Sequence, residues 1–240
     1  MRWGRSICGF GVVLAATLVA ASANAGDEDR AAPETWYARS LARSESALNV
    51  TYFWSKGPKM RSETVILGHR IVTIVNGETY YAYDASAGHG IAIGRAAEAI
   101  AADAPKRRPF GQEVETLLRQ GAEKVGEETV RGRTCDLYRV TDSAGRRQVW
   151  TTQDEPRVTI KIEIFNRPTG GRQYIDYDEW LRGLPIADSF FEPSAALRLE
   201  RFTLEEYLLR SAREGPVGPV PILYADLLHG RSKPSGSAAD

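Results

Sequence analysis

The chain has 240 residues, of which 42% are hydrophobic and 26% are charged. This composition is typical of a globular protein with a hydrophobic core, and the length fits one domain. Basic and acidic residues number 31 each, so the formal net charge is zero. That balance argues against a nucleic-acid-binding protein, because such proteins carry a basic excess. The mean hydropathy of −0.34 argues against a protein with several membrane spans.

The N-terminal segment has the pattern of a secretory signal peptide. Arg2 and Arg5 form a basic start, residues 9–21 are small and apolar, and an Ala-Asn-Ala motif at residues 23–25 matches a cleavage site. The apolar stretch is too short for a membrane span. We therefore expect residues 1–25 to be removed and the mature chain to be exported.

The chain has two cysteines, and only one of them belongs to the expected mature protein. Cys8 lies in the signal peptide, which leaves Cys135 as the sole thiol. An intramolecular disulfide is therefore excluded. Cys135 could be a nucleophile, but a free cysteine is more often a small buried hydrophobic residue.

The first part of the mature chain has a helical pattern followed by strand patterns. Pro33 suits the first turn of a helix, and Tyr37 and Leu41 recur at helical spacing, which predicts a helix over residues 34–47. The dipeptide Asn76-Gly77 between two β-rich runs predicts a hairpin with a type I′ turn. Strands are predicted at residues 48–54, 60–67, 70–75 and 78–83.

A loop is expected at residues 84–90, continuing into a glycine-rich flexible loop at residues 88–94. Two helices are then expected to interrupt the strands, at residues 95–102 and 111–120. Further strands are predicted at residues 135–141, 147–152, 158–165 and 173–177. The strand at 158–165 has the clearest alternation, with one apolar and one polar face, which is typical of an antiparallel sheet. Its apolar side chains are Val158, Ile160, Ile162 and Ile164. In the strand at 48–54, one face carries Leu48, Val50, Tyr52 and Trp54.

The C-terminal part contains one helix signal and then a proline-rich segment. Thr203 and Glu206 form a capping box, and the helix that they begin is expected to run to Arg213. Prolines 216, 219 and 221 predict a stiff linker. A short helix is expected at residues 222–228 and a disordered polar tail at residues 232–240.

These elements predict the domain organisation and the fold class. The expected units are a signal peptide (1–25), a folded domain (26–215) and a C-terminal extension (216–240) with the linker, short helix and tail. Strands that follow one another through tight turns indicate an antiparallel sheet. We expect an α+β fold with one large curved antiparallel sheet, an unclosed β-barrel, covered on its concave side by helices.

No constellation of catalytic or metal-binding residues is evident in the sequence. His69, His89 and His229 are the only histidines, and none has metal-ligand spacing. We therefore expect no enzyme activity, no metal and no cofactor. Lys106-Arg107-Arg108 is a basic cluster between two prolines. It is either a solvated loop or a contact for an anionic membrane surface or partner.

Several segments, taken in chain order, resemble the LolA-like superfamily of periplasmic lipoprotein-sorting and carrier proteins. The segments that carry the resemblance are residues 56–63, 74–84, 123–138, 149–150 and 190–193. The resemblance implies an unclosed antiparallel β-barrel with a helical lid, located in the periplasm. It also implies a cavity that sequesters lipid or lipoprotein acyl chains, for outer-membrane lipoprotein sorting or lipid trafficking.

The resemblance implies two candidate functions, and the residues themselves leave two uses of the apolar sheet face open. The first function is a carrier of a lipid or acyl chain, with an envelope membrane protein as a further candidate partner. The alternative is an envelope-stress sensing module, a regulatory interaction protein with the same fold. The apolar face can hold a ligand or simply pack against helices. The candidate cavity residues are Val50, Tyr52, Trp54, Met60, Ile66, Ile160, Ile162 and Ile164.

Overall fold

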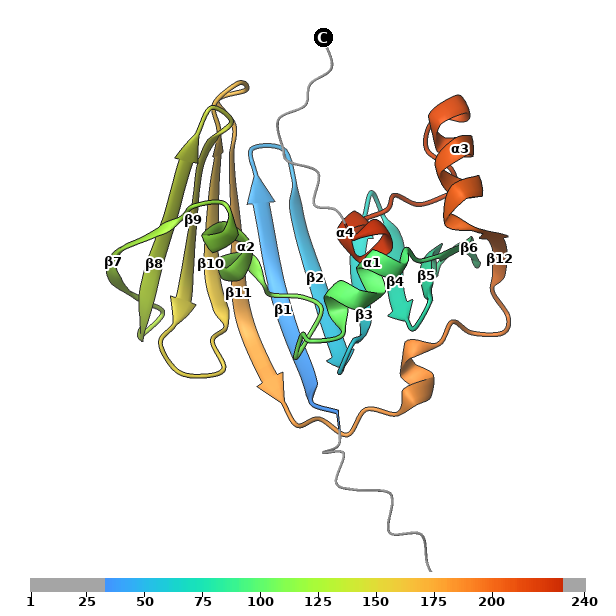
Figure 1. The fold of residues 1–240 in the computed structure, drawn as a ribbon, viewed down its shortest axis with the longest axis horizontal. Coiled ribbons are helices and arrows are strands. Elements are labelled where there is room, and N and C mark those ends of the chain that lie inside the picture. The colour runs from blue at the N-terminus through green and yellow to red at the C-terminus, as the bar shows by residue number, and fades with distance from the viewer. Residues whose placement is uncertain (1–32, 231–240) are drawn as a thin grey trace, which may run out of the picture. The chain divides into compact units, whose positions relative to one another are not determined.

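The computed structural model describes residues 33–230, which form one 12-stranded sheet (Figure 1). The expectations for the signal peptide, for Cys8 and for the tail at 232–240 lie outside the described residues. The strands are β1 (Thr35–Ser44), β2 (Leu48–Lys56), β3 (Lys59–Ile66), β4 (His69–Asn76), β5 (Thr79–Asp84), β6 (His89–Gly94), β7 (Glu123–Val130), β8 (Arg133–Asp142), β9 (Gly145–Thr152), β10 (Thr159–Asn166), β11 (Arg172–Arg182) and β12 (Arg198–Phe202).

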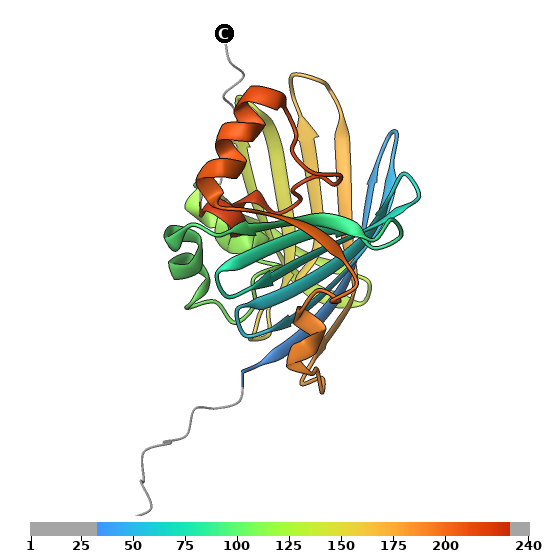
Figure 2. The same ribbon diagram turned by 90° about the vertical axis from the view of Figure 1, so that its right-hand side faces the viewer.

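The sheet is open and almost entirely antiparallel. Its strand order is β12-β6-β5-β4-β3-β2-β1-β11-β10-β9-β8-β7, and only the β12–β6 pair is parallel. The two edge strands, β7 and β12, do not pair with each other. Figure 2 shows the curvature of the sheet. The expectation of a large, curved, unclosed antiparallel sheet is therefore confirmed.

The helices are few and short, which makes the fold mostly β rather than α+β. They are α1 (Ala97–Asp103), α2 (Glu113–Arg119), α3 (Leu204–Glu214), α4 (Ala225–His229) and the 3-10 helix η1 (Asp188–Phe191). In Figure 1, α1, α2 and α4 all lie in front of the sheet. We call that side the inner face. The helix α3 begins at the predicted Thr203–Glu206 capping box and buries none of its residues.

The alternation in β10 decides which of its side chains reach the inner face. Ile162 lies directly opposite Val149 of β9 and Ile175 of β11. These three apolar residues therefore form a row across three neighbouring strands. Lys161, on the opposite face, lies over the ring of Trp150 at 4.5 Å. The prediction that Ile162 faces the interior is confirmed.

The helix predicted over residues 34–47 is wrong, because this segment is the central strand β1. It pairs with β2 on one side and with β11 on the other. Trp36 and Ala38 are buried on its inner face while Tyr37 is only half-buried, which is the period of a strand. Pairing with two long neighbours satisfies the backbone of this segment, and the helical spacing of its apolar residues is incidental.

The predicted loop at residues 84–94 is wrong in its second half, where β6 pairs with both β5 and β12. Ile91 and Ile93 of β6 are fully buried. The strand β7 has no predicted counterpart, because its side chains are polar and exposed along most of its length. A strand prediction depends on the alternation of apolar and polar residues. Burial of both faces removes this alternation in β6, and exposure along most of the strand removes it in β7.

The hairpin turn at Asn76-Gly77 differs from the predicted turn type. The hairpin at Asn76-Gly77 is present, but its two-residue loop is Gly77-Glu78, between the paired residues Asn76 and Thr79. Gly77 has a φ of +59°, whereas Glu78 does not have a positive φ. That arrangement corresponds to a type II′ turn rather than the expected type I′ turn.

A type I′ turn does occur at Leu67-Gly68, between the paired residues Ile66 and His69. Leu67 has a φ of +50°, and its side chain is 96% exposed. The left-handed conformation costs a leucine roughly 1–2 kcal/mol, whereas asparagine adopts it more easily. Exposure leaves leucine no packing contact to offset this cost.

We therefore expect Leu67→Asn to raise the free energy of unfolding by about 1 kcal/mol, because Asn-Gly is a preferred type I′ pair. Urea denaturation measures the change in midpoint. Leu48→Asn is the matched control, since Leu48 is also exposed but begins a strand. An unchanged or lower midpoint for Leu67→Asn would contradict the expectation.

The segment 216–230, predicted as a linker and a short helix, packs against the inner face of the sheet. The short helix is present as α4. Val217 and Val220, in the proline-rich part, are buried, as are Leu227 and Leu228 of α4. The Arg95 guanidinium donates to the Leu227 carbonyl at 2.6 Å. This part of the C-terminal extension therefore belongs to the folded core.

A second, smaller core lies on the outer face of the sheet. Phe191 of η1 is fully buried there against Val72 and Ile74 of β4. Trp54 of β2 packs edge-on against Phe190, with ring centroids 5.3 Å apart. The segment between β11 and β12 therefore covers part of the outer face.

Candidate functional site

The candidate site is a cavity of about 630 Å³ on the inner face. Its floor is formed by β2, β9, β10 and β11, and its walls by α2, α4 and the loop before α2. The volume lies within the range of small-molecule sites. The apolar and aromatic side chains that line it are Phe53, Phe110, Leu117, Val149, Ile162, Ile164, Ile175, Tyr177, Tyr224 and Leu227.

Two of the eight predicted residues, Ile162 and Ile164, line this cavity. Ile160 and Met60 are buried in the inner core, and Ile66 packs against that core, but none of these three lines the cavity. Their position on the inner side agrees with the alternation that the sequence shows. Whether any of these residues contacts a ligand stays a prediction.

The other three predicted residues, Val50, Tyr52 and Trp54, lie on the outer face, which corrects the predicted orientation of β2. Phe53, between Tyr52 and Trp54, is the residue of this strand that lines the cavity. Val50 and Tyr52 are 37% and 38% exposed. Successive side chains in a strand point to opposite faces. An error in assigning one residue of β2 to a face therefore places every side chain of the strand on the wrong face.

The sequence-based search missed the residues that α2 contributes to the site. Glu113, in the first turn of α2, accepts hydrogen bonds from Thr159 Oγ1 at 2.9 Å and from the Tyr177 hydroxyl at 2.7 Å. Burial, together with the Glu113 carboxylate, raises the pKa of Tyr177 well above its usual value. Glu113 therefore fixes the start of α2 to the sheet. The apolar spacing in the sequence predicted the helix α2. It could not show that Glu113 contacts Thr159 and Tyr177, because these residues are distant in the sequence.

Arg108 holds the loop that forms one wall of the cavity. Its guanidinium lies 4.7 Å from the ring of Trp36 and 4.9 Å from the ring of Trp180. It donates hydrogen bonds to the carbonyl oxygens of Phe110 at 3.1 Å and of Arg157 at 2.9 Å. Burial lowers the pKa of Arg108, yet a guanidinium stays protonated in proteins.

The predicted basic cluster at residues 106–108 is therefore not a uniformly solvated loop. Arg108 is only 4% exposed. Lys106 is bound to Asp103 at 2.9 Å, and only Arg107 is exposed to solvent. The Arg108 guanidinium lies between two indole rings and donates its hydrogen bonds to carbonyl oxygens of the fold. Arg108 therefore has a structural role.

Tyr224, which directly precedes α4, lines the cavity and packs against the inner core. Its ring meets that of Phe53 edge-on, with centroids 6.1 Å apart. Burial raises the pKa of Tyr224 to about 12. The C-terminal segment thus borders the cavity, whose floor is formed by β2, β9, β10 and β11.

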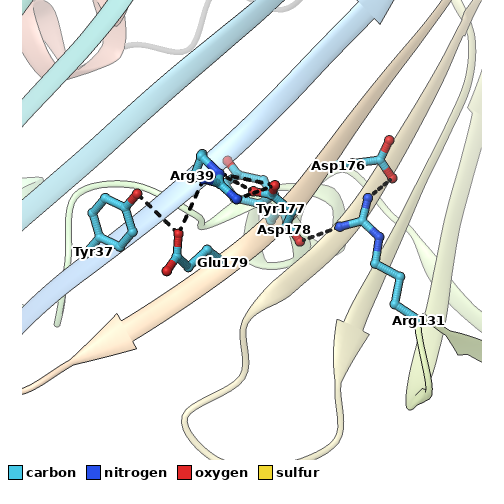
Figure 3. Close-up of polar contacts among 7 residues, drawn as sticks. All are labelled: Tyr37, Arg39, Arg131, Asp176, Tyr177, Asp178 and Glu179. Carbon is cyan, nitrogen blue, oxygen red and sulfur yellow. Dashed lines mark hydrogen bonds and ion pairs between the residues drawn. The ribbon is translucent and has the colours of Figure 1, made fainter.

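The outer face opposite the cavity carries a network of ion pairs between β1 and β11 (Figure 3). Arg39 contacts the Asp178 carboxylate at 2.8 Å, and this hydrogen-bonded contact lowers the pKa of Asp178. Arg131, in the β7–β8 turn, contacts Asp176 at 3.3 Å. Arg39 and Asp178 are partly exposed, so their ion pair contributes about 0–1 kcal/mol at most. The network fixes the β7–β8 turn to β11.

The described residues do not form a metal site or a membrane-spanning helix. Among residues 33–230, no group of three or more His, Cys, Asp or Glu side chains is placed to hold a metal ion. No helix in that range has both the length and the hydropathy needed to cross a membrane.

Cys135 is buried, as the sequence led us to expect, and burial raises the pKa of its thiol. A raised pKa leaves less thiolate at neutral pH, which disfavours a nucleophilic role. We expect Cys135→Ala to lower the free energy of unfolding by about 1–2 kcal/mol through lost packing and to leave ligand binding intact. Urea denaturation and a fatty-acid titration measure both. Loss of binding with an unchanged unfolding midpoint would contradict this expectation.

No protein-family model matches the chain, and no curated protein matches it either. Solved structures do match its fold. An uncharacterized conserved protein from Thermus thermophilus aligns with a TM-score of 0.51 and 8% identity, over 70% of this chain and 90% of the other. At this identity, the match shows a shared fold.

Two further matches have lower TM-scores. The complex of Pseudomonas aeruginosa MucA/MucB matches with a TM-score of 0.43 and 14% identity, over 70% of this chain and 58% of the other. A domain described as a putative outer membrane lipoprotein-sorting protein, from Vibrio parahaemolyticus, matches with a TM-score of 0.30 and 11% identity, over 68% and 91% of the two chains.

Proposed function

We propose that the protein is a non-enzymatic binding protein of the periplasm that sequesters an acyl chain in the inner cavity. The observation that carries this proposal is the apolar row of Val149, Ile162 and Ile175 across the cavity floor. In this proposal α1, α2 and α4 form the cover of the site. The resemblance of the sequence to lipoprotein-sorting carriers supports lipid trafficking or lipoprotein sorting as the context.

The mechanism of binding would be hydrophobic transfer. Each buried methylene contributes about 0.8 kcal/mol, so ten methylenes would contribute about 8 kcal/mol before the cost of association is subtracted. The cavity volume of about 630 Å³ is within the range that takes a ligand of this size. Apolar contacts of this kind select for chain length and for little else, which suits a carrier of varied lipids.

The test is to identify what the protein holds when it is purified without detergent. Solvent extraction followed by mass spectrometry is expected to recover about one acyl-chain lipid per protein chain. If the preparation is empty, incubation with dodecanoate is expected to give a saturable one-to-one complex. An empty preparation that also takes up no dodecanoate would contradict the proposal.

A further inference from the structure

The cavity has cationic side chains at one end, next to the apolar row. Arg147 of β9 is two residues before Val149 on the same face of the strand, and it lies opposite Ile164 of β10. Its guanidinium donates to Gln120 Oε1 at 2.7 Å. Because Gln120 directly follows α2, this hydrogen bond holds Arg147 beside the end of the helix.

The same end of α2 carries a second guanidinium. Arg119 is in the last turn of the helix, is exposed, and lines the cavity. Its hydrogen bond goes to the neutral hydroxyl of Thr116 at 3.1 Å. Arg147 also contacts the Asp142 carboxylate, but its own side chain remains 19% exposed. Two guanidinium groups therefore lie where the cavity meets solvent.

Asp142 pairs with Arg147 at this end but does not line the cavity, and the carboxylates that do line it lie elsewhere. Glu113 is at the opposite end of α2, where it accepts hydrogen bonds from the buried residues Thr159 and Tyr177. Asp226 belongs to α4, on another wall. Along α2 the lining thus changes from a carboxylate at the buried end to guanidinium groups at the exposed end, with apolar residues beneath.

From this arrangement we infer that the ligand is an amphiphile with an anionic head group, a carboxylate or a phosphate. Its acyl chain lies along the apolar row, and its head group accepts hydrogen bonds from Arg119 and Arg147. Guanidinium groups suit this role because their fixed donors match both anions. The inference rests on the proposed function and adds a head-group specificity that apolar contacts cannot supply.

The test compares two ligands with the same chain and different head groups. Isothermal titration of the full chain is expected to show that dodecanoate binds about tenfold more tightly than 1-dodecanol, since a charge-assisted hydrogen bond is stronger than a neutral one. Arg147→Gln or Arg119→Gln is expected to reduce this ratio to about two. Arg147→Lys, which keeps the charge, should retain part of it.

The matched control is Arg146→Gln. Arg146 neighbours Arg147 in β9 but lies on the outer face, near Glu163 and Arg172. It changes the net charge equally and should leave the ratio at about ten. Circular dichroism of each variant shows that the comparison is between folded proteins.

Every outcome of these titrations bears on the inference. Equal affinities for the two ligands, or a ratio that Arg147→Gln and Arg119→Gln leave unchanged, would overturn the anionic head group and keep the acyl-chain site. Failure of both ligands to bind would overturn the proposed function as well. Competition by inorganic phosphate at the concentration at which dodecyl phosphate binds would identify a simple anion site and also overturn the inference.

Discussion

Replacing Arg108 with alanine is expected to lower the free energy of unfolding by about 3 kcal/mol. The substitution removes the cation between the rings of Trp36 and Trp180 and leaves the carbonyl oxygens of Phe110 and Arg157 without their donor. A desolvated cation–π contact contributes about 2 kcal/mol, and an unsatisfied buried acceptor costs about 1–3 kcal/mol. Urea denaturation measures the loss.

The neighbouring Arg107→Ala is the control for this prediction. Arg107 is exposed, and a surface substitution of this kind changes stability by about 0.5 kcal/mol or less. The two variants remove the same charge from adjacent positions of one loop. Equal unfolding midpoints for both variants would show that the buried guanidinium does not hold the cavity wall.

A carboxylate at position 162 is expected to abolish acyl-chain binding. Ile162 lies at the centre of the apolar row, between Val149 and Ile175, and lines the cavity. Ile162→Glu removes an apolar side chain from the floor and places a charge where the chain would lie. Because water can enter an open cavity and hydrate that charge, we expect a fall of about 2–3 kcal/mol in stability and at least a tenfold fall in dodecanoate affinity.

Val50→Glu is the matched control, because it also replaces a β-branched apolar residue of the sheet by glutamate. Val50 is 37% exposed on the outer face. We expect its affinity for dodecanoate to equal that of the unsubstituted protein. A loss of affinity in Val50→Glu, with none in Ile162→Glu, would show that the ligand binds to the outer face.

The features that the sequence predicted correctly are those that local chemistry decides. The alternation of β10, the capping box of α3 and the hairpin at Asn76-Gly77 each depend on residues close together in the chain. An apolar residue at every second position requires one buried face, whichever strands pair with it. Strand pairing then brings Ile162 to the cavity floor.

The orientation of β2 could not be read from its own residues, because both of its faces are aromatic. Phe53 lines the cavity, whereas Trp54 packs against Phe190 on the outer face. The cover provided by η1 is more than 100 residues away in sequence and gives the outer face an apolar core of its own. A strand with two apolar faces does not reveal which face meets the ligand.

The helix expected over β1 failed for a related reason. The segment Thr35–Ser44 becomes a strand because β2 and β11 pair with both of its edges, and β11 is distant in the sequence. Likewise, the prolines around Val217 and Val220 predicted a linker, yet both valines are buried on the inner face. Long-range pairing and packing override local propensity at these positions.

The most direct test of the central claim is to locate a bound acyl chain by photocrosslinking. A fatty acid with a diazirine near its methyl end, irradiated in a one-to-one complex and mapped by peptide mass spectrometry, should label the cavity-lining residues of β9, β10 and α2. An excess of unlabelled dodecanoate should prevent the labelling. Labelling on the outer face at Val50, Tyr52 or Trp54, or labelling that dodecanoate does not prevent, would contradict an acyl-chain site in the inner cavity.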